Sequence, residues 1–125
     1  MSDSARKQIT ALLSMLTEKM ISCDYDPRSY WSKEVTFDYG TPNQVCVDYM
    51  KFEPLNNTVS GIEKGNFYCY EVKSCEADFL SGHGLNFIGD YNYIVCRTNF
   101  MNGCLRTINF RSVLVYILCL RIKIN

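Results

Sequence analysis

The sequence predicts an α/β domain of the α+β kind, in which a central mixed sheet is flanked by helices. Three observations support this fold class: a long amphipathic segment near the N-terminus, several runs with strand-like alternation, and a short helix between the third and fourth of those runs. The chain has 125 residues, the usual size of one domain. We therefore expect residues 1–125 to form a single domain with its core over about residues 30–95.

The first predicted element is a helix over residues 5–21. Its large apolar residues recur at intervals of three and four, as on one face of a helix. These residues are Ile9, Leu12, Leu13, Leu16 and Met20. Ser4 is the expected N-cap, with Ser2 and Asp3 as competing candidates. The apolar stripe favours packing on the domain core over packing on a partner.

Two strands joined by a turn are predicted next. Residues 34–39 and 45–52 have strand-like composition, and the turn residues 40–43 between them include a glycine and a proline. We expect an antiparallel hairpin. Alternation along its second strand places Val45, Val47 and Tyr49 on one face and Cys46, Asp48, Met50 and Phe52 on the other.

A polar loop over residues 54–66 leads to a third predicted strand over residues 66–73, which is rich in aromatic residues. Its side chains alternate between two faces. One face carries Phe67, Cys69, Glu71 and Lys73, and the other carries Tyr68, Tyr70 and Val72.

A short helix is predicted to follow the third strand. Ser74 is its expected N-cap and Leu80 lies near its end, where Gly82 and Gly84 stop it. Residues 91–96 then form a fourth strand. A helix that connects two strands in this way indicates a βαβ crossover and hence a parallel pair within the sheet.

The tail, residues 97–125, is apolar and basic, and its pattern does not predict a definite series of helices and strands. Its longest strongly apolar stretch is residues 113–120, which is too short for a membrane helix of about 20 residues. A buried strand or a short helix is expected there. The polar N-terminus does not resemble a secretory signal. No membrane partner is expected.

Charge is unevenly distributed although the net charge is formally zero. Residues 30–90 contain nine acids and four lysines, whereas residues 91–125 contain four arginines, one lysine and no acid. This pattern fits an acidic metal-binding centre beside a basic strip that meets phosphates. Chance segregation on a neutral surface explains it equally well.

The cysteine pattern favours a reducing compartment. There are seven cysteines, an odd number, without any Cys-x-x-Cys pair or zinc-site spacing. Several lie inside strand-like runs, where a free thiol behaves as a small apolar side chain. We expect a cytoplasmic protein.

The residues that carry candidate chemistry are Asp48, Glu71 and Lys73. Glu71 and Lys73 share one strand face and lie about 6.5–7 Å apart along the strand. Asp48 is a charge within an apolar strand and needs a partner or a metal ion. If the second and third strands are neighbours, Asp48 and Glu71 can converge on one Mg²⁺, while Lys73 orients water or stabilises charge during phosphodiester hydrolysis.

A simpler interpretation competes with this one, because Glu-x-Lys on a strand is most often a solvated face or a surface ion pair. Similarly, Asp78 on the short helix is expected to have a structural role, and His83 is more typical of a helix cap or a surface residue than of a ligand.

The motif around these residues resembles the PD-(D/E)xK nuclease superfamily. Val47-Asp48 on one strand and residues 70–74, with the order Tyr-Glu-Val-Lys-Ser, on the next match its pattern. The runs 75–81 and 83–93 look like the segments after the motif in small MmcB-like and phage-type members. The resemblance covers about residues 30–95. Valine replaces the proline of the name, and the tail departs from the family's expected last elements.

This resemblance implies a restriction-endonuclease-like fold with Asp48 and Glu71 as ligands of Mg²⁺ or Mn²⁺. It implies Lys73 as the catalytic lysine, and Glu34 is the candidate for the additional upstream glutamate that many members use. Glu34 is equally explained as a surface strand residue. The predicted contacts with nucleic acid are His83, Asn86 and Arg97.

The predicted function is metal-dependent endonuclease cleavage of DNA in repair, recombination or restriction-like processing. The alternative is a nuclease-fold module without catalysis, which binds nucleic acid or protein, for example as an inhibitor made by a mobile element. DNA is the expected partner in the first case, while a homodimer and a protein partner stay open. A structural domain with a surface Glu71–Lys73 pair is the third alternative.

Overall fold

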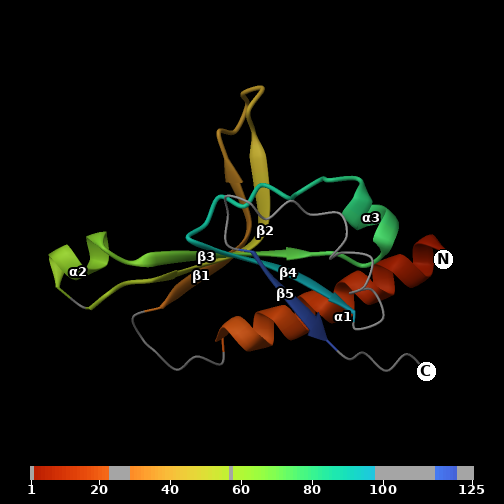
Figure 1. Cartoon of the computed structure of the whole chain (residues 1–125), viewed down its shortest axis with the longest axis horizontal. Coiled ribbons are helices and arrows are strands. Elements are labelled where there is room, and N and C mark those ends of the chain that lie inside the picture. The colour runs from red at the N-terminus through yellow and green to blue at the C-terminus, as the bar shows by residue number, and fades with distance from the viewer. Residues whose placement is uncertain (1, 23–28, 57, 98–114, 121–125) are drawn as a thin grey trace.

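The structure is a computed structural model that describes residues 2–22, 29–56, 58–97 and 115–120 (Figure 1). The described part holds a five-stranded sheet in the order β1-β2-β3-β4-β5. Its strands are β1 (Tyr30–Phe37), β2 (Val45–Glu53), β3 (Asn66–Val72), β4 (Tyr91–Arg97) and β5 (Val115–Leu120). Its helices are α1 (Asp3–Ser22), α2 (Val59–Glu63) and α3 (Glu76–Leu80).

The sheet is mixed. β1 with β2 and β2 with β3 pair antiparallel, whereas β3 with β4 and β4 with β5 pair parallel. The hairpin and the β3–α3–β4 crossover form as predicted, although β1 begins at Tyr30 and ends at Phe37 rather than spanning residues 34–39. The fold class of a mixed sheet flanked by helices is confirmed. The finer restriction-endonuclease-like assignment stays a prediction. In the described part of the chain, no helix is both long and apolar enough to cross a membrane.

Helix α1 covers one face of the sheet (Figure 1). Its buried positions are four residues apart, which gives a single narrow seam: Ile9, Leu13, Thr17 and Ile21. Thr17 is tolerated there because its hydroxyl donates to the Leu13 carbonyl at 2.8 Å. Met20 was predicted in the seam, but it lies off this spacing and is 38% exposed.

The seam packs on the face of the sheet that carries Tyr49, Tyr70 and Val72, with Val95 from β4. The predicted alternation along β3 is thereby confirmed, since Glu71 lies between two residues of this cluster and faces the other way. The start of α1 differs from the prediction. Ser2 caps it, because the Ala5 amide donates to Ser2 Oγ at 3.2 Å.

The opposite face of the sheet is covered by α3 and the loop after it. Phe79 and Ile94 form a second buried cluster there, with Leu85, Phe87 and Ile117 packed around it. The N-cap of α3 is Cys75, not the predicted Ser74, and its side chain makes no capping hydrogen bond. Ser74 is instead buried between β3 and the helix.

Two further segments differ from the predictions. Helix α2 lies within the predicted loop 54–66, and its Thr58 cap accepts a hydrogen bond from the Gly61 amide at 3.1 Å. In the tail, β5 shows that the strand alternative was right for residues 115–120. Residues 98–114 and 121–125, which hold most of the predicted basic strip, lie outside the described residues.

The β1–β2 hairpin is bent at Glu34 and Asp48, and Asp48 is one of the candidate site residues. Pairing continues on both sides of Glu34 and Asp48 but omits these two residues. Glu34 has φ +54°, a left-handed conformation that is unfavourable for a residue with a side chain. The outer half of the hairpin consequently stands away from the rest of the sheet (Figure 1).

Candidate active site

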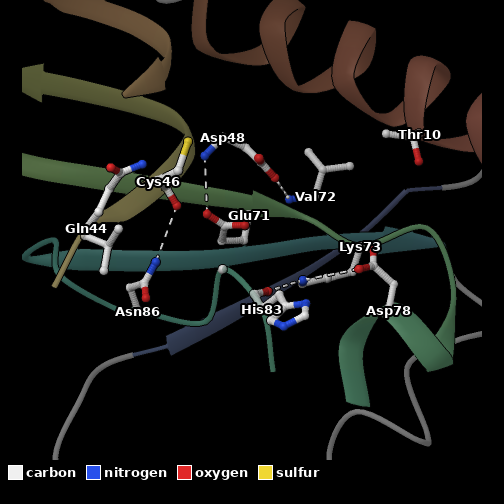
Figure 2. Close-up of a pocket in the computed structure, with 12 residues that line it drawn as sticks. Thr10, Gln44, Cys46, Asp48, Glu71, Val72, Lys73, Asp78, His83 and Asn86 are labelled. Carbon is white, nitrogen blue, oxygen red and sulfur yellow. Dashed lines mark hydrogen bonds and ion pairs between the residues drawn. The ribbon is translucent and has the colours of Figure 1, made fainter. Parts of the chain in front are cut away.

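An open pocket of about 420 Å³ lies where β2 begins and β3 ends, between the bent hairpin, α1 and the loop after α3 (Figure 2). Asp48, Glu71 and Lys73 all line it. The sequence therefore placed these three side chains correctly in one hollow.

Asp48 and Glu71 meet because the antiparallel ladder of β2 and β3 stops one pair before them, at Tyr49 and Tyr70. Glu71 Oε1 accepts a hydrogen bond from the Asp48 amide at 3.2 Å, and Asp48 Oδ2 accepts one from the Val72 amide at 2.8 Å. Each carboxylate thus takes the place of a backbone carbonyl as acceptor. Two acids from adjacent strands are held side by side (Figure 2).

Glu71 is a buried acid, with only 8% of its surface exposed. Burial, which disfavours the charged form, raises the pKa of Glu71 to about 8, and the neighbouring charge of Asp48 adds to the rise. The hydrogen bond from the Asp48 amide and the charge of Lys73 oppose it. At neutral pH and without a bound cation, Glu71 is therefore mostly protonated.

Lys73 lies one residue beyond β3 and is almost completely buried, with 4% exposed. Its ammonium group donates to the His83 carbonyl and forms an ion pair with Asp78 Oδ1 at 3.6 Å (Figure 2). Its backbone amide donates to the Val95 carbonyl at 2.9 Å. The lysine is thus fixed from both ends at the wall of the pocket.

Asp78 lines the pocket, a position that the sequence did not reveal. Its predicted structural role agrees with the ion pair to Lys73, but the residue also faces the site. No pattern in the sequence predicts the ion pair between Asp78 and Lys73, because this contact depends on the direction that α3 takes after β3.

The loop after α3 lies directly against the acids. Gly84 has φ +78°, and a Cβ atom at this position would clash with Glu71 Oε2 and lie 3.0 Å from Glu71 Cδ. Asn86 donates from Nδ2 to the Cys46 carbonyl at 3.3 Å and so ties the loop to β2. Close approach of the main chain to Glu71 therefore requires glycine at position 84.

The remaining predicted site residues are placed as follows. His83 and Asn86 line the pocket, although His83 contributes its carbonyl rather than its ring to the contact with Lys73. Glu34 is exposed at the bend and is not among the residues that line the pocket. Arg97 ends β4 two residues after Val95, on the face of the sheet covered by α1, and is likewise outside the pocket lining.

The groups that suit a cation are the two carboxylates of Asp48 and Glu71. Within the described residues, no cluster of three or more His, Cys, Asp or Glu side chains is arranged to hold a metal ion. Two carboxylates nevertheless fit Mg²⁺, which proteins commonly bind through one or two carboxylates with water and substrate phosphate completing the shell. A cation here would also relieve the repulsion between Asp48 and Glu71.

Comparisons with known proteins add no relative: no protein-family model, no curated protein and no solved structure matches the chain. The resemblance to the PD-(D/E)xK superfamily accordingly stays a prediction that depends on the motif residues and their placement in this pocket.

Proposed function

We propose that the pocket hydrolyses phosphodiester bonds of DNA with the help of a divalent cation. The observation that carries this proposal is the convergence of Asp48, Glu71 and Lys73 on one open pocket, where the pKa of Glu71 is raised to about 8. A strongly shifted carboxyl group beside a second acid and a buried lysine is typical of a functional site.

Asp48 and Glu71 would hold Mg²⁺ or Mn²⁺. When bound, such an ion polarises a phosphoryl oxygen and lowers the pKa of a coordinated water. Before it binds, Glu71 must lose the proton that its raised pKa retains, so cation binding and proton release are coupled at this residue.

Lys73 supplies the positive charge on the other side of the pocket. In the structure its ammonium is held by Asp78 and the His83 carbonyl. A phosphate oxygen in the pocket would compete with Asp78 for this ammonium, and charge that grows on the phosphate during hydrolysis strengthens the new contact. Asp78 thus keeps the lysine oriented until substrate arrives.

The direct test is a nuclease assay on several DNA forms with Mg²⁺ and with Mn²⁺. We expect cation-dependent cleavage that is lost in Lys73→Ala and Asp48→Ala, by a factor of about 100 or more, because the first removes a positive charge beside the reacting phosphate and the second removes a ligand of the divalent cation. Lys64→Ala, an exposed lysine after α2, is the matched control and should cleave normally. Full cleavage by both purified site variants would refute the proposal.

A second candidate function is a nuclease-like module without catalysis that binds nucleic acid or protein, such as a mobile-element inhibitor. The observation in its favour is that each of the three groups already has a partner in the protein: Asp48 the Val72 amide, Glu71 the Asp48 amide, and Lys73 Asp78. It predicts no cleavage at any cation concentration. Binding that is insensitive to salt would then indicate a protein partner.

The proposed setting is the cytoplasm. Four cysteines of the described residues, Cys46, Cys69, Cys75 and Cys96, are free thiols. Burial raises the pKa of Cys69 to about 11, which keeps this thiol neutral and unreactive inside the sheet. Such cysteines suit a compartment in which thiols stay reduced.

A further inference from the structure

A second groove, of about 500 Å³, adjoins the pocket of Asp48 and Glu71. Thr10 and Asp78 line both hollows, so the two meet at these residues. Figure 2 shows Thr10 on α1 on the Lys73 side of the pocket. From there the groove follows the first turns of α1 over Arg6 and Lys7.

The groove itself is lined by two cations, Arg6 and Lys7. Arg6 is half-buried and Lys7 is exposed, and within the described part of the chain neither forms an ion pair. The acids of the same groove are Asp3 and Asp78, and Asp78 is paired with Lys73 at 3.6 Å. Lys73 lines the adjoining pocket rather than the groove, and it is the ion-pair partner of Asp78. Arg6 and Lys7 therefore face one further acid in the groove, Asp3.

The spacing along α1 suits a polynucleotide. Arg6 precedes Thr10 by four residues, a rise of about 6 Å along the helix. One strand of DNA advances about 3.4 Å per nucleotide along its axis. The basic residues therefore lie one to two nucleotides from the junction of the two hollows.

We propose that this groove binds the DNA strand next to the cleaved bond, so that Arg6 and Lys7 contact a flanking phosphate while a phosphodiester occupies the pocket. This inference rests on the proposed function of the same pocket. It assigns phosphate binding to the start of α1. The sequence instead suggested Arg97, which lies on the opposite face of the sheet from Glu71.

The experiment measures binding of a short fluorescein-labelled DNA duplex by fluorescence anisotropy over a series of salt concentrations, with EDTA present so that the DNA stays intact. It compares the unchanged full chain with the double variant Arg6→Gln/Lys7→Gln. The matched control is Lys33→Gln/Lys64→Gln, which removes the same charge from exposed positions on β1 and after α2. Helix α2 and the start of α1 lie at opposite ends of the long axis (Figure 1).

We expect the groove variant to bind more weakly and to depend less on salt. Each lost phosphate contact lowers the slope of log affinity against log salt by about 0.9, so the slope should fall by up to about 1.8. The ratio of the DNA affinity of the unchanged protein to that of the variant should then fall roughly tenfold between about 50 and 200 mM salt. The control should keep the original slope.

Equal slopes and affinities for the groove variant and the control would overturn the inference, as would a chain that does not bind the duplex at all. A parallel cleavage assay separates the two proposals. Normal cleavage with an unchanged slope refutes the groove and leaves the hydrolytic function standing. A reduced slope without cleavage in Mg²⁺ or Mn²⁺ supports the groove and refutes hydrolysis.

Discussion

Glu71 owes its raised pKa to where β3 places it: buried, beside Asp48 and under the main chain of Gly84. The folded chain therefore binds a proton that the unfolded chain, with an ordinary carboxyl pKa of 4.5, gives up. Between pH about 4.5 and about 8 the folded state holds more protons than the unfolded state. Stability consequently falls as pH rises through this window.

The first prediction concerns this loss of stability in metal-free buffer. Glu71→Gln keeps an oxygen acceptor for the Asp48 amide but cannot ionise. Since one pKa unit corresponds to about 1.4 kcal/mol, the unchanged protein should lose a few kcal/mol more than the variant between about pH 5 and about pH 9. Urea unfolding at both pH values measures this, and parallel pH profiles would contradict it.

The second prediction concerns the cation. Because Glu71 must lose its proton before it can act as a ligand, Mn²⁺ affinity should rise with pH until the pKa of about 8 is passed. Calorimetric titration with Mn²⁺ at several pH values measures this dependence. Asp48→Asn serves as the control and should bind Mn²⁺ at least about tenfold more weakly. A pH-independent affinity would exclude Glu71 as a ligand.

At this scale the sequence predicted the grouping of Asp48, Glu71 and Lys73, because strand alternation determines which side chains share a face. It did not predict the neighbours that complete the pocket. Asp78 and Gly84 reach the site from a helix and a loop, and no local pattern encodes where a crossover returns to the sheet.

At the scale of elements, the loop after α3 shows how closely a connection can constrain a site. Gly82 and Gly84 both adopt positive φ, +74° and +78°. Only Gly84 also lies against Glu71, whereas a Cβ on Gly82 would meet no atom within 4 Å. A substitution at Gly82 therefore carries only the cost of the backbone conformation, whereas the same substitution at Gly84 also crowds the Glu71 carboxyl.

The third prediction uses this pair. Gly82→Ala should lower the free energy of unfolding by about 1 kcal/mol, the usual cost of a side chain in the left-handed region. Gly84→Ala should cost more and also shift the pH profile of unfolding, because its methyl group displaces the Glu71 carboxyl. Urea unfolding over a pH series tests both variants. Equal losses with unchanged profiles would show that the loop does not constrain Glu71.

The elements that sequence patterns predicted well are those with strong periodicity: α1, the hairpin and β3. Helix α2 was missed because its five residues include a glycine and a serine, which are poor helix formers, and its start depends on the Thr58 cap. The α3 cap was assigned one residue too early because serine is a favoured N-cap residue type. In the structure Ser74 is buried between β3 and α3, and Cys75 is the N-cap.

At the scale of the whole molecule, the sheet joins an antiparallel half, β1–β3, to a parallel half, β3–β5. The adjacency of β2 and β3 was left open by the sequence, whereas the pairs β1–β2 and β3–β4 followed from the hairpin and the crossover. The place of β5 did not, because an isolated apolar run does not indicate which strand it pairs with or in which direction. Its register with β4 brings Ile117 beside the cluster of Phe79 and Ile94.

The fourth prediction tests whether β5 is part of the core. Ile117→Asp puts a charge against this cluster and should lower the free energy of unfolding by about 2–4 kcal/mol. Val59→Asp, at a position that is 79% exposed, is the control and should change it by less than about 0.5 kcal/mol. Chemical unfolding measures both, and a neutral effect of Ile117→Asp would remove β5 from the core.

One consequence of the interrupted β2–β3 ladder concerns hydrogen exchange. The Asp48 and Val72 amides donate to carboxylates, whereas their neighbours within the sheet donate to backbone carbonyls. Their exchange with deuterated solvent therefore follows the state of the acid pair as well as the opening of the sheet. These two amides are built-in reporters, whose protection changes when the carboxylates take a proton, a cation or a substrate.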